Sequence, residues 1–95
     1  MTYTPATQDQ LLAIRVNAGI DDLANSEKFA AAEPDMVEAI VAGIGEFAAG
    51  EWAPLNRIGD IEGAKLENGV VRLPDRFAEA YAHYVEQGWN AISGP

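Results

Sequence analysis

The stretch that decides the fold is residues 34–60, PDMVEAIVAGIGEFAAGEWAPLNRIGD. Pro34 suits the first position of a helix, because its missing N–H would be unpaired there in any case. Apolar residues then recur at steps of three and four, which predicts an apolar stripe along a long amphipathic helix. The stripe consists of Val37, Ile40, Val41, Ile44, Phe47 and Ala48.

Pro54 interrupts this pattern. It donates no backbone hydrogen bond and its ring clashes with the carbonyl of Gly50, which costs about 3 kcal/mol in a helix interior. We therefore expect a kink or break between Gly50 and Pro54, with helical structure resuming through Leu55 to Ile58. Gly43 and Gly45 also cost about 1 kcal/mol each relative to Ala, so we expect a close backbone contact on their face.

The residues before Pro34 predict short helical pieces. One runs from Thr7 to Ile20 with Gly19 near its end. Asp21 can cap a second turn, and Ser26 can cap another that leads to Phe29. Isolated helices shorter than about 12–15 residues are marginal in water, so these pieces need packing partners.

The residues after Asp60 predict one hairpin and one further helix. Asn68-Gly69 lies between short apolar pieces, and both residue types tolerate positive φ, as a tight hairpin turn requires. Residues 75–87 place apolar side chains on one face until Gly88 ends the helix. The predicted fold class is therefore mainly α, with short N-terminal helices, one long helix kinked near Pro54, a small hairpin and the helix over 75–87.

Composition limits the possible functions. The chain has 95 residues and a net charge of -9, which disfavours nucleic acid as a partner. It has no cysteine, which excludes disulfides and thiol chemistry. No apolar run approaches the roughly 20 residues of a membrane span, and the N-terminus lacks the pattern of a signal peptide. We expect a soluble, cytoplasmic protein with a thin core, because a chain of this size buries only roughly 60–65% of its unfolded surface.

His83 is the one residue with an obvious metal-binding or acid-base chemistry. Glu79 and Glu86 share its helix face at steps of four and three, which is compatible with weak metal binding. The set is short of ligands, so we interpret it as a solvated helix face. Carboxylate pairs such as Asp21-Asp22, or Glu46 with Glu51, also lack an apolar setting and are interpreted as surface.

The aromatic residues could line a ligand cleft, but aromatics at helical spacing are more often core residues. Arg57 either closes a helix end or contacts a neighbouring domain or partner chain. The apolar stripes exceed what this chain can hide, so we expect a partner. We predict self-association through Val37, Ile40, Ile44 and Phe47, or through Phe77, Tyr81 and Tyr84. The packing and interface candidates are Val37, Ile40, Ile44, Phe47, Trp52, Arg57, Phe77, Tyr81, Tyr84 and Trp89.

Three pieces in order resemble the N-terminus of bacterial acyl-CoA dehydrogenases, in the larger subgroup with a short helical extension. They are residues 11–35 (LLAIRVNAGIDDLANSEKFAAAEPD), residues 34–60, and residues 62–95 (EGAKLENGVVRLPDRFAEAYAHYVEQGWNAISGP). The resemblance implies an extension over residues 1–33 and the start of the N-terminal helical domain over 34–95. It also implies that the chain is a truncated part of a longer enzyme of fatty acid metabolism.

The family's reaction is an FAD-dependent α,β-dehydrogenation of an acyl-CoA thioester. A glutamate removes the α-proton, hydride passes to the flavin, and the electrons leave to an acceptor. The family's base and flavin site lie in later domains, so the resemblance implies no catalytic, cofactor or metal residue here. The expected partners are the remaining chain, the acyl-CoA and an electron acceptor for the parent enzyme, and a second copy of the chain. Alone, the chain is expected to be inactive and free of FAD. The alternative is a free-standing acidic helical interaction module.

Overall fold

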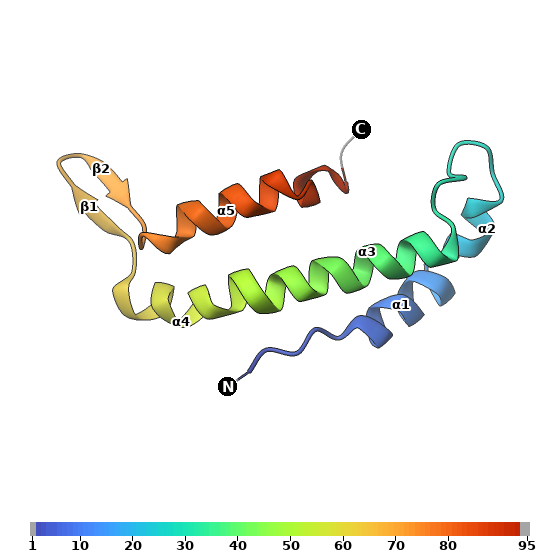
Figure 1. The fold of residues 1–95 in the computed structure, drawn as a ribbon, viewed down its shortest axis with the longest axis horizontal. Coiled ribbons are helices and arrows are strands. Elements are labelled where there is room, and N and C mark those ends of the chain that lie inside the picture. Colours follow the sequence, from blue (N-terminus) through green and yellow to red (C-terminus); the bar gives the residue numbers. More distant parts are fainter. Residues whose placement is uncertain (1, 94–95) are drawn as a thin grey trace. The chain divides into compact units, whose positions relative to one another are not determined.

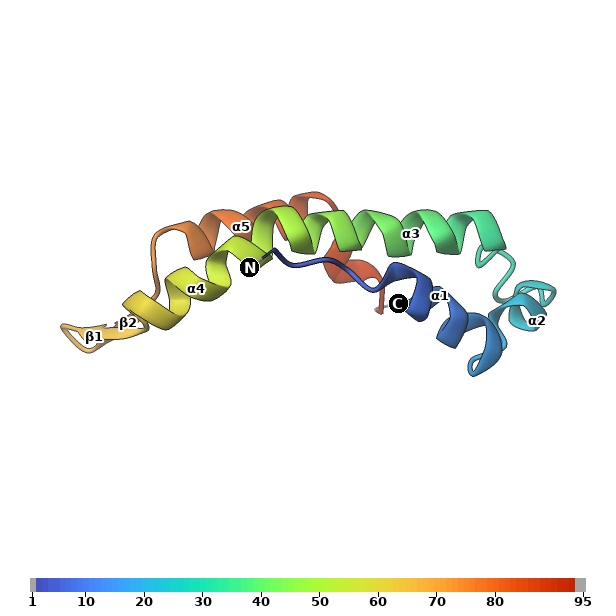
Figure 2. The same cartoon turned by 90° about the horizontal axis from the view of Figure 1, so that it is seen from below.

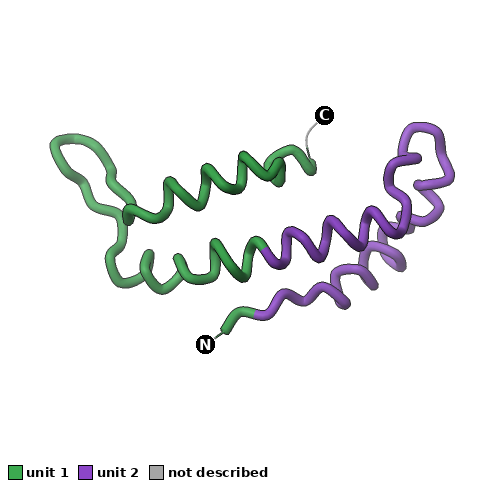
Figure 3. Tube along the Cα trace, viewed as in Figure 1, with its two compact units in different colours: residues 1–3, 47–95 green, residues 4–46 purple. Residues whose placement is uncertain are grey.

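The computed structural model describes residues 2–93 and is mainly helical, with one small antiparallel hairpin (Figure 1), which confirms the predicted fold class. It divides into two compact units, residues 4–46 and residues 2–3 with 47–93 (Figure 3). The boundary at Phe47 lies within a helical run. The division between residues 33 and 34 that the resemblance implies stays a prediction.

The first unit opens with α1 (Thr7–Val16) and α2 (Ile20–Ala24). The predicted cap at Asp21 is wrong, because Gly19 adopts φ 61° and lets the turn begin one residue earlier. The Gly19 carbonyl accepts the N–H groups of Asp22 and Leu23 at 3.1 and 3.3 Å. Ser26 does cap a turn: its hydroxyl accepts the N–H of Phe29 at 3.3 Å and donates to the Leu23 carbonyl at 2.7 Å. The following residues form turns rather than a helix.

The first unit also contains α3 (Pro34–Phe47) up to Glu46, and the helix begins at Pro34 as predicted. The expected close contact is confirmed at Gly45, which is buried. A Cβ atom there would lie 3.1 Å from Cβ of Pro5 and 3.2 Å from Cγ2 of Thr7. The segment before α1 therefore packs directly on the backbone of α3.

The predicted interruption before Pro54 is a π-helical turn. α3 passes into η1 (Ala48–Trp52) and then into α4 (Ala53–Glu62). The N–H of Ala53 bonds the carbonyl of Ala48, five residues back. This extra residue per turn lets α4 restart with Pro54 in its first turn, where no N–H is needed. The helix then extends beyond Ile58 to Glu62.

The hairpin joins α4 to α5 within the second unit (Figures 1 and 2). Its strands are β1 (Lys65–Glu67) and β2 (Val70–Arg72), with Leu66 opposite Val71. The turn lies at Asn68 and Gly69, with φ 51° and 79°, which confirms the predicted turn. Helix α5 (Arg76–Glu86) follows and ends before Gly88, and η2 (Trp89–Ala91) comes next.

The core is thin, as its size predicts. The buried hydrophobic residues of the described part are Leu11, Phe47, Leu55 and Ala80. Many large apolar side chains stay exposed, among them Leu12, Val16, Leu66, Val71, Leu73 and Tyr81. No helix among residues 2–93 combines the length and apolar character needed to cross a bilayer.

Candidate functional site

An aromatic cluster lies where η1 meets α5 in the second unit. The rings of Trp52 and Tyr84 have centroids 4.9 Å apart, and Phe47 meets Trp52 edge to face at 5.4 Å. Phe47 also lies 6.0 Å from Tyr84, and Tyr81 lies 6.2 Å from Tyr84. These separations are those of stabilising aromatic pairs. Phe47 is the buried centre, whereas Tyr81 is 65% exposed.

The π-turn brings two members of this cluster onto one face. Phe47 and Trp52 are five residues apart, and in an α-helix of 3.6 residues per turn they would point about 140° apart. Hydrogen bonding from residue i to i+5 widens the turn and so brings such a pair closer to the same face. The turn that accommodates Pro54 therefore also sets the edge-to-face contact of Phe47 with Trp52.

His83 pairs with Glu51, directly beside the aromatic contact. Its Nδ1 lies 3.1 Å from Oε2 of Glu51, and both side chains are half-buried. The hydrogen bond to Glu51 and the charge of that carboxylate raise the pKa of His83. Partial removal from water opposes this rise, and the charges of Glu79 and Glu86 add to it. Glu79 and Glu86 are exposed, in agreement with the predicted solvated face, whereas His83 is half-buried because α5 turns it toward a carboxylate on η1.

Metal binding has no support in the described part of the chain. Among residues 2–93, no three His, Asp or Glu side chains lie close enough together to hold a metal ion. Glu79, His83 and Glu86 are thus not gathered into such a group in the described residues.

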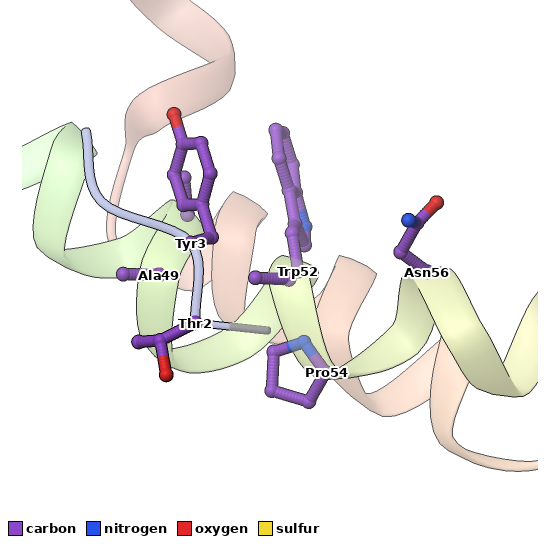
Figure 4. Close-up of a pocket in the computed structure, with 8 residues that line it drawn as sticks. Thr2, Tyr3, Ala49, Trp52, Pro54 and Asn56 are labelled. Carbon is purple, nitrogen blue, oxygen red and sulfur yellow. The ribbon is translucent and has the colours of Figure 1, made fainter. Parts of the chain in front are cut away.

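A groove of ≈ 670 Å³ in the same unit has Trp52 among its lining residues. Figure 4 shows the rings of Tyr3 and Trp52 projecting in the same direction, one from the N-terminal segment and one from the helix. Its lining consists of Thr2, Tyr3, Ala48, Ala49, Trp52, Ala53, Pro54 and Asn56. The volume is in the range of small-molecule pockets, and the walls are mainly apolar and aromatic.

Neither of two hollows in the second unit fits the pyrophosphate of a flavin dinucleotide or the phosphates of CoA. Such groups bind at cationic side chains or at helix N-termini, and the groove beside Trp52 has no charged lining residue. A second hollow, between α4 and the hairpin, has two cations, Lys65 and Arg72. It also has three carboxylates, Glu62, Glu67 and Asp75, so its own charge disfavours an anion.

The remaining predicted interface residues lie on separate elements of the two units. Val37, Ile40 and Ile44 are half-buried on α3, in the first unit, while Arg57 is exposed on α4. Phe77 contacts α4 at Gly59. Trp89 lies on η2, where its indole N–H donates to Oε1 of Gln87 at 2.9 Å. The structure brings together Phe47, Trp52, Tyr81 and Tyr84.

Sequence reasoning missed two features of this region. Tyr3 had no periodic pattern around it, so nothing indicated that it would line a groove with Trp52. Glu51 and His83 are separated by 32 residues, and only the unpredicted path of the hairpin joins their helices. The sequence did contain one indication of this pairing. Glu51-Trp52 and His83-Tyr84 are both a polar residue followed directly by an aromatic residue.

Comparison with known proteins identifies one relevant relative. The chain is 36% identical over 95 residues to 3-methylmercaptopropionyl-CoA dehydrogenase of Ruegeria pomeroyi. The match covers 100% of this chain and 16% of the relative, so the chain spans about one sixth of that protein's length. No family model matches, and no solved structure matches. The match confirms the resemblance to an acyl-CoA dehydrogenase.

Proposed function

We propose that this chain is the N-terminal part of a flavin-dependent acyl-CoA dehydrogenase. The observation that carries the proposal is the 36% identity to such an enzyme over all 95 residues. The parent reaction is α,β-dehydrogenation of an acyl-CoA thioester, with electrons passed from FAD to an electron-transfer acceptor. The name of the relative makes 3-methylmercaptopropionyl-CoA the first substrate to test.

Within that enzyme, the chain serves packing and substrate-wall roles rather than chemistry. Neither hollow has a net positive lining for the phosphates of FAD or CoA, which supports a packing role for these residues. The large apolar residues that stay exposed, such as Tyr81 and Leu66, supply surface for contact with other parts of the enzyme.

The test compares the 95-residue chain with a longer product of the same reading frame. We expect the longer product to copurify with FAD and to oxidise the acyl-CoA in the presence of an artificial electron acceptor. We expect the 95-residue chain to do neither. Flavin binding by the short chain would refute its packing role, and a longer product without flavin or activity would refute the family assignment.

A matched pair of variants tests the packing surface. Tyr81 is 65% exposed, but its ring also faces Tyr84 at 6.2 Å, so Tyr81→Glu should cost the short chain no more than that aromatic pair, about 0.5–1.5 kcal/mol. In the longer product it should lower the midpoint further, because it also places a charge in a contact between parts of the enzyme. Glu86→Gln, on the same helix and also exposed, is the control and should change neither midpoint.

A second candidate is a free-standing acidic interaction module that self-associates. The exposed apolar residues and the net charge of -9 favour it. Sedimentation velocity of the short chain decides: a dimer that Ile44→Glu disrupts supports self-association through α3. A cooperative monomer would count against this candidate, and an unchanged dimer in that variant would exclude the α3 surface.

A further inference from the structure

Two side-by-side contacts join η1 to α5, and they differ in chemistry. Glu51 and Trp52 are consecutive in η1, and His83 and Tyr84 are consecutive in α5. The first members form a charge-assisted hydrogen bond of 3.1 Å, and the second members stack with centroids 4.9 Å apart. The Glu51–His83 and Trp52–Tyr84 contacts involve adjacent residues on both η1 and α5. A large separation of one contact therefore disturbs the other.

We propose that the Glu51–His83 pair is a proton-dependent clasp that holds α5 against the π-turn, so that loss of the His83 proton loosens the packing of Trp52 on Tyr84. The clasp is intrinsic to this chain and does not depend on the dehydrogenase assignment. Trp52 also lines the groove beside η1, so the clasp governs one wall of that groove.

The local charges fix the direction of the response. The groups that face His83 are Glu51 from η1 and Glu79 and Glu86 from its own helix, all carboxylates. Protonation therefore creates an ion pair without a competing cation. The three carboxylates, Glu51 first among them, together raise the pKa of His83 in the folded chain. The contribution to stability is full below about pH 6.5, the ordinary histidine value, and is lost as the pH rises through the raised pKa.

The clasp lies at a π-turn, a feature that is frequent at functional sites when it occurs inside an α-helix. Here the turn orients Glu51 and Trp52 together. Histidine is the side chain whose charge changes most readily between about pH 5 and pH 8, and His83 is the only histidine of the chain. A titration in this range therefore reports on one ring.

The test follows His83 and Trp52 in the same samples. Proton NMR of the single histidine gives its pKa directly, and the emission maximum of Trp52 gives its contact with water. A Trp89→Phe background leaves Trp52 as the only tryptophan. We expect the Trp52 maximum to move to longer wavelength as the pH rises, with the midpoint of the His83 titration. The wavelength is the readout because imidazolium quenching would change intensity alone.

Glu51→Gln is the decisive variant, and Glu86→Gln is its matched control. Glu51→Gln should lower the His83 midpoint toward about 6.5 and remove most of the wavelength shift. Glu86→Gln, which removes a more distant charge, should keep most of both. In the unmodified chain, the Trp52 indole N–H resonance provides the same information if Trp89→Phe fails to fold. A His83 midpoint unchanged by Glu51→Gln, or a Trp52 signal that does not follow His83, would overturn the proposal.

Discussion

Gly59 is the position where a single methyl group most directly probes the packing of α4 on α5. A Cβ atom added at Gly59 would lie 2.9 Å from Cζ of Phe77. That is well inside the roughly 3.5–4.0 Å at which two carbon atoms attract best. Gly59→Ala therefore forces either the Phe77 ring or the helix to move.

Two opposing effects determine the size of the change. Replacing Gly by Ala in a helix interior stabilises it by about 1 kcal/mol, whereas overpacking costs about 1–3 kcal/mol. The net effect of Gly59→Ala is then a loss of up to about 2 kcal/mol. Gly50→Ala is the matched control, because Gly50 is helical and its added Cβ would meet nothing within 4 Å. It should gain up to about 1 kcal/mol.

Thermal unfolding followed by circular dichroism measures the difference between these two variants. In a chain of this size each kcal/mol shifts the midpoint by roughly 4–8 °C, so the two should be clearly separated, with Gly59→Ala lower. Phe77→Leu removes the atom at the contact, so it should relieve part of the loss when combined with Gly59→Ala. Neighbouring residues couple by about 0.5–3 kcal/mol in such a cycle. Equal midpoints for the two glycine variants, with no coupling to Phe77, would refute the close contact.

Three further changes test local features by the same unfolding assay. Gly45→Ala should destabilise by up to about 2 kcal/mol, the overpacking cost of about 1–3 kcal/mol less the helix gain of about 1 kcal/mol, because its Cβ would lie 3.1 Å from the rigid ring of Pro5; a midpoint above that of the unmodified chain would contradict this packing. Asn68→Ala should weaken the hairpin by about 1 kcal/mol, since Asn68 has φ 51°, while Asn68→Gly should be nearly neutral; equal effects would exclude backbone strain as the cause. Ser26→Ala should cost about 0.5–1 kcal/mol through its two hydrogen bonds, and an unchanged midpoint would show that the turn needs no cap.

The features that sequence alone predicts are those with local causes. Pro34 marks a helix start because its own ring sets φ and removes one donor. Asn68-Gly69 marks the hairpin because the turn needs positive φ at both central residues. Gly45 is expected to meet a neighbour, but only the structure identifies that neighbour as Pro5. The error at Asp21 has a local cause too, since the preceding Gly19 takes over the start of the turn.

The candidate site depends instead on how far the helix rotates at the π-turn before Pro54, and on contacts between residues that are far apart in the sequence. Pro54 predicts an interruption, but a break, a kink and a π-turn all relieve the same missing donor. Only the π-turn rotates Trp52 onto the face of Phe47, and only then do Trp52 and Glu51 meet Tyr84 and His83. The aromatic cluster and the Glu51–His83 pair thus both result from the rotation that the π-turn gives to the helix. An interpretation of Pro54 as a helix breaker alone predicts neither the aromatic cluster nor the Glu51–His83 pair, because it ignores how residues 47–52 are oriented relative to α5.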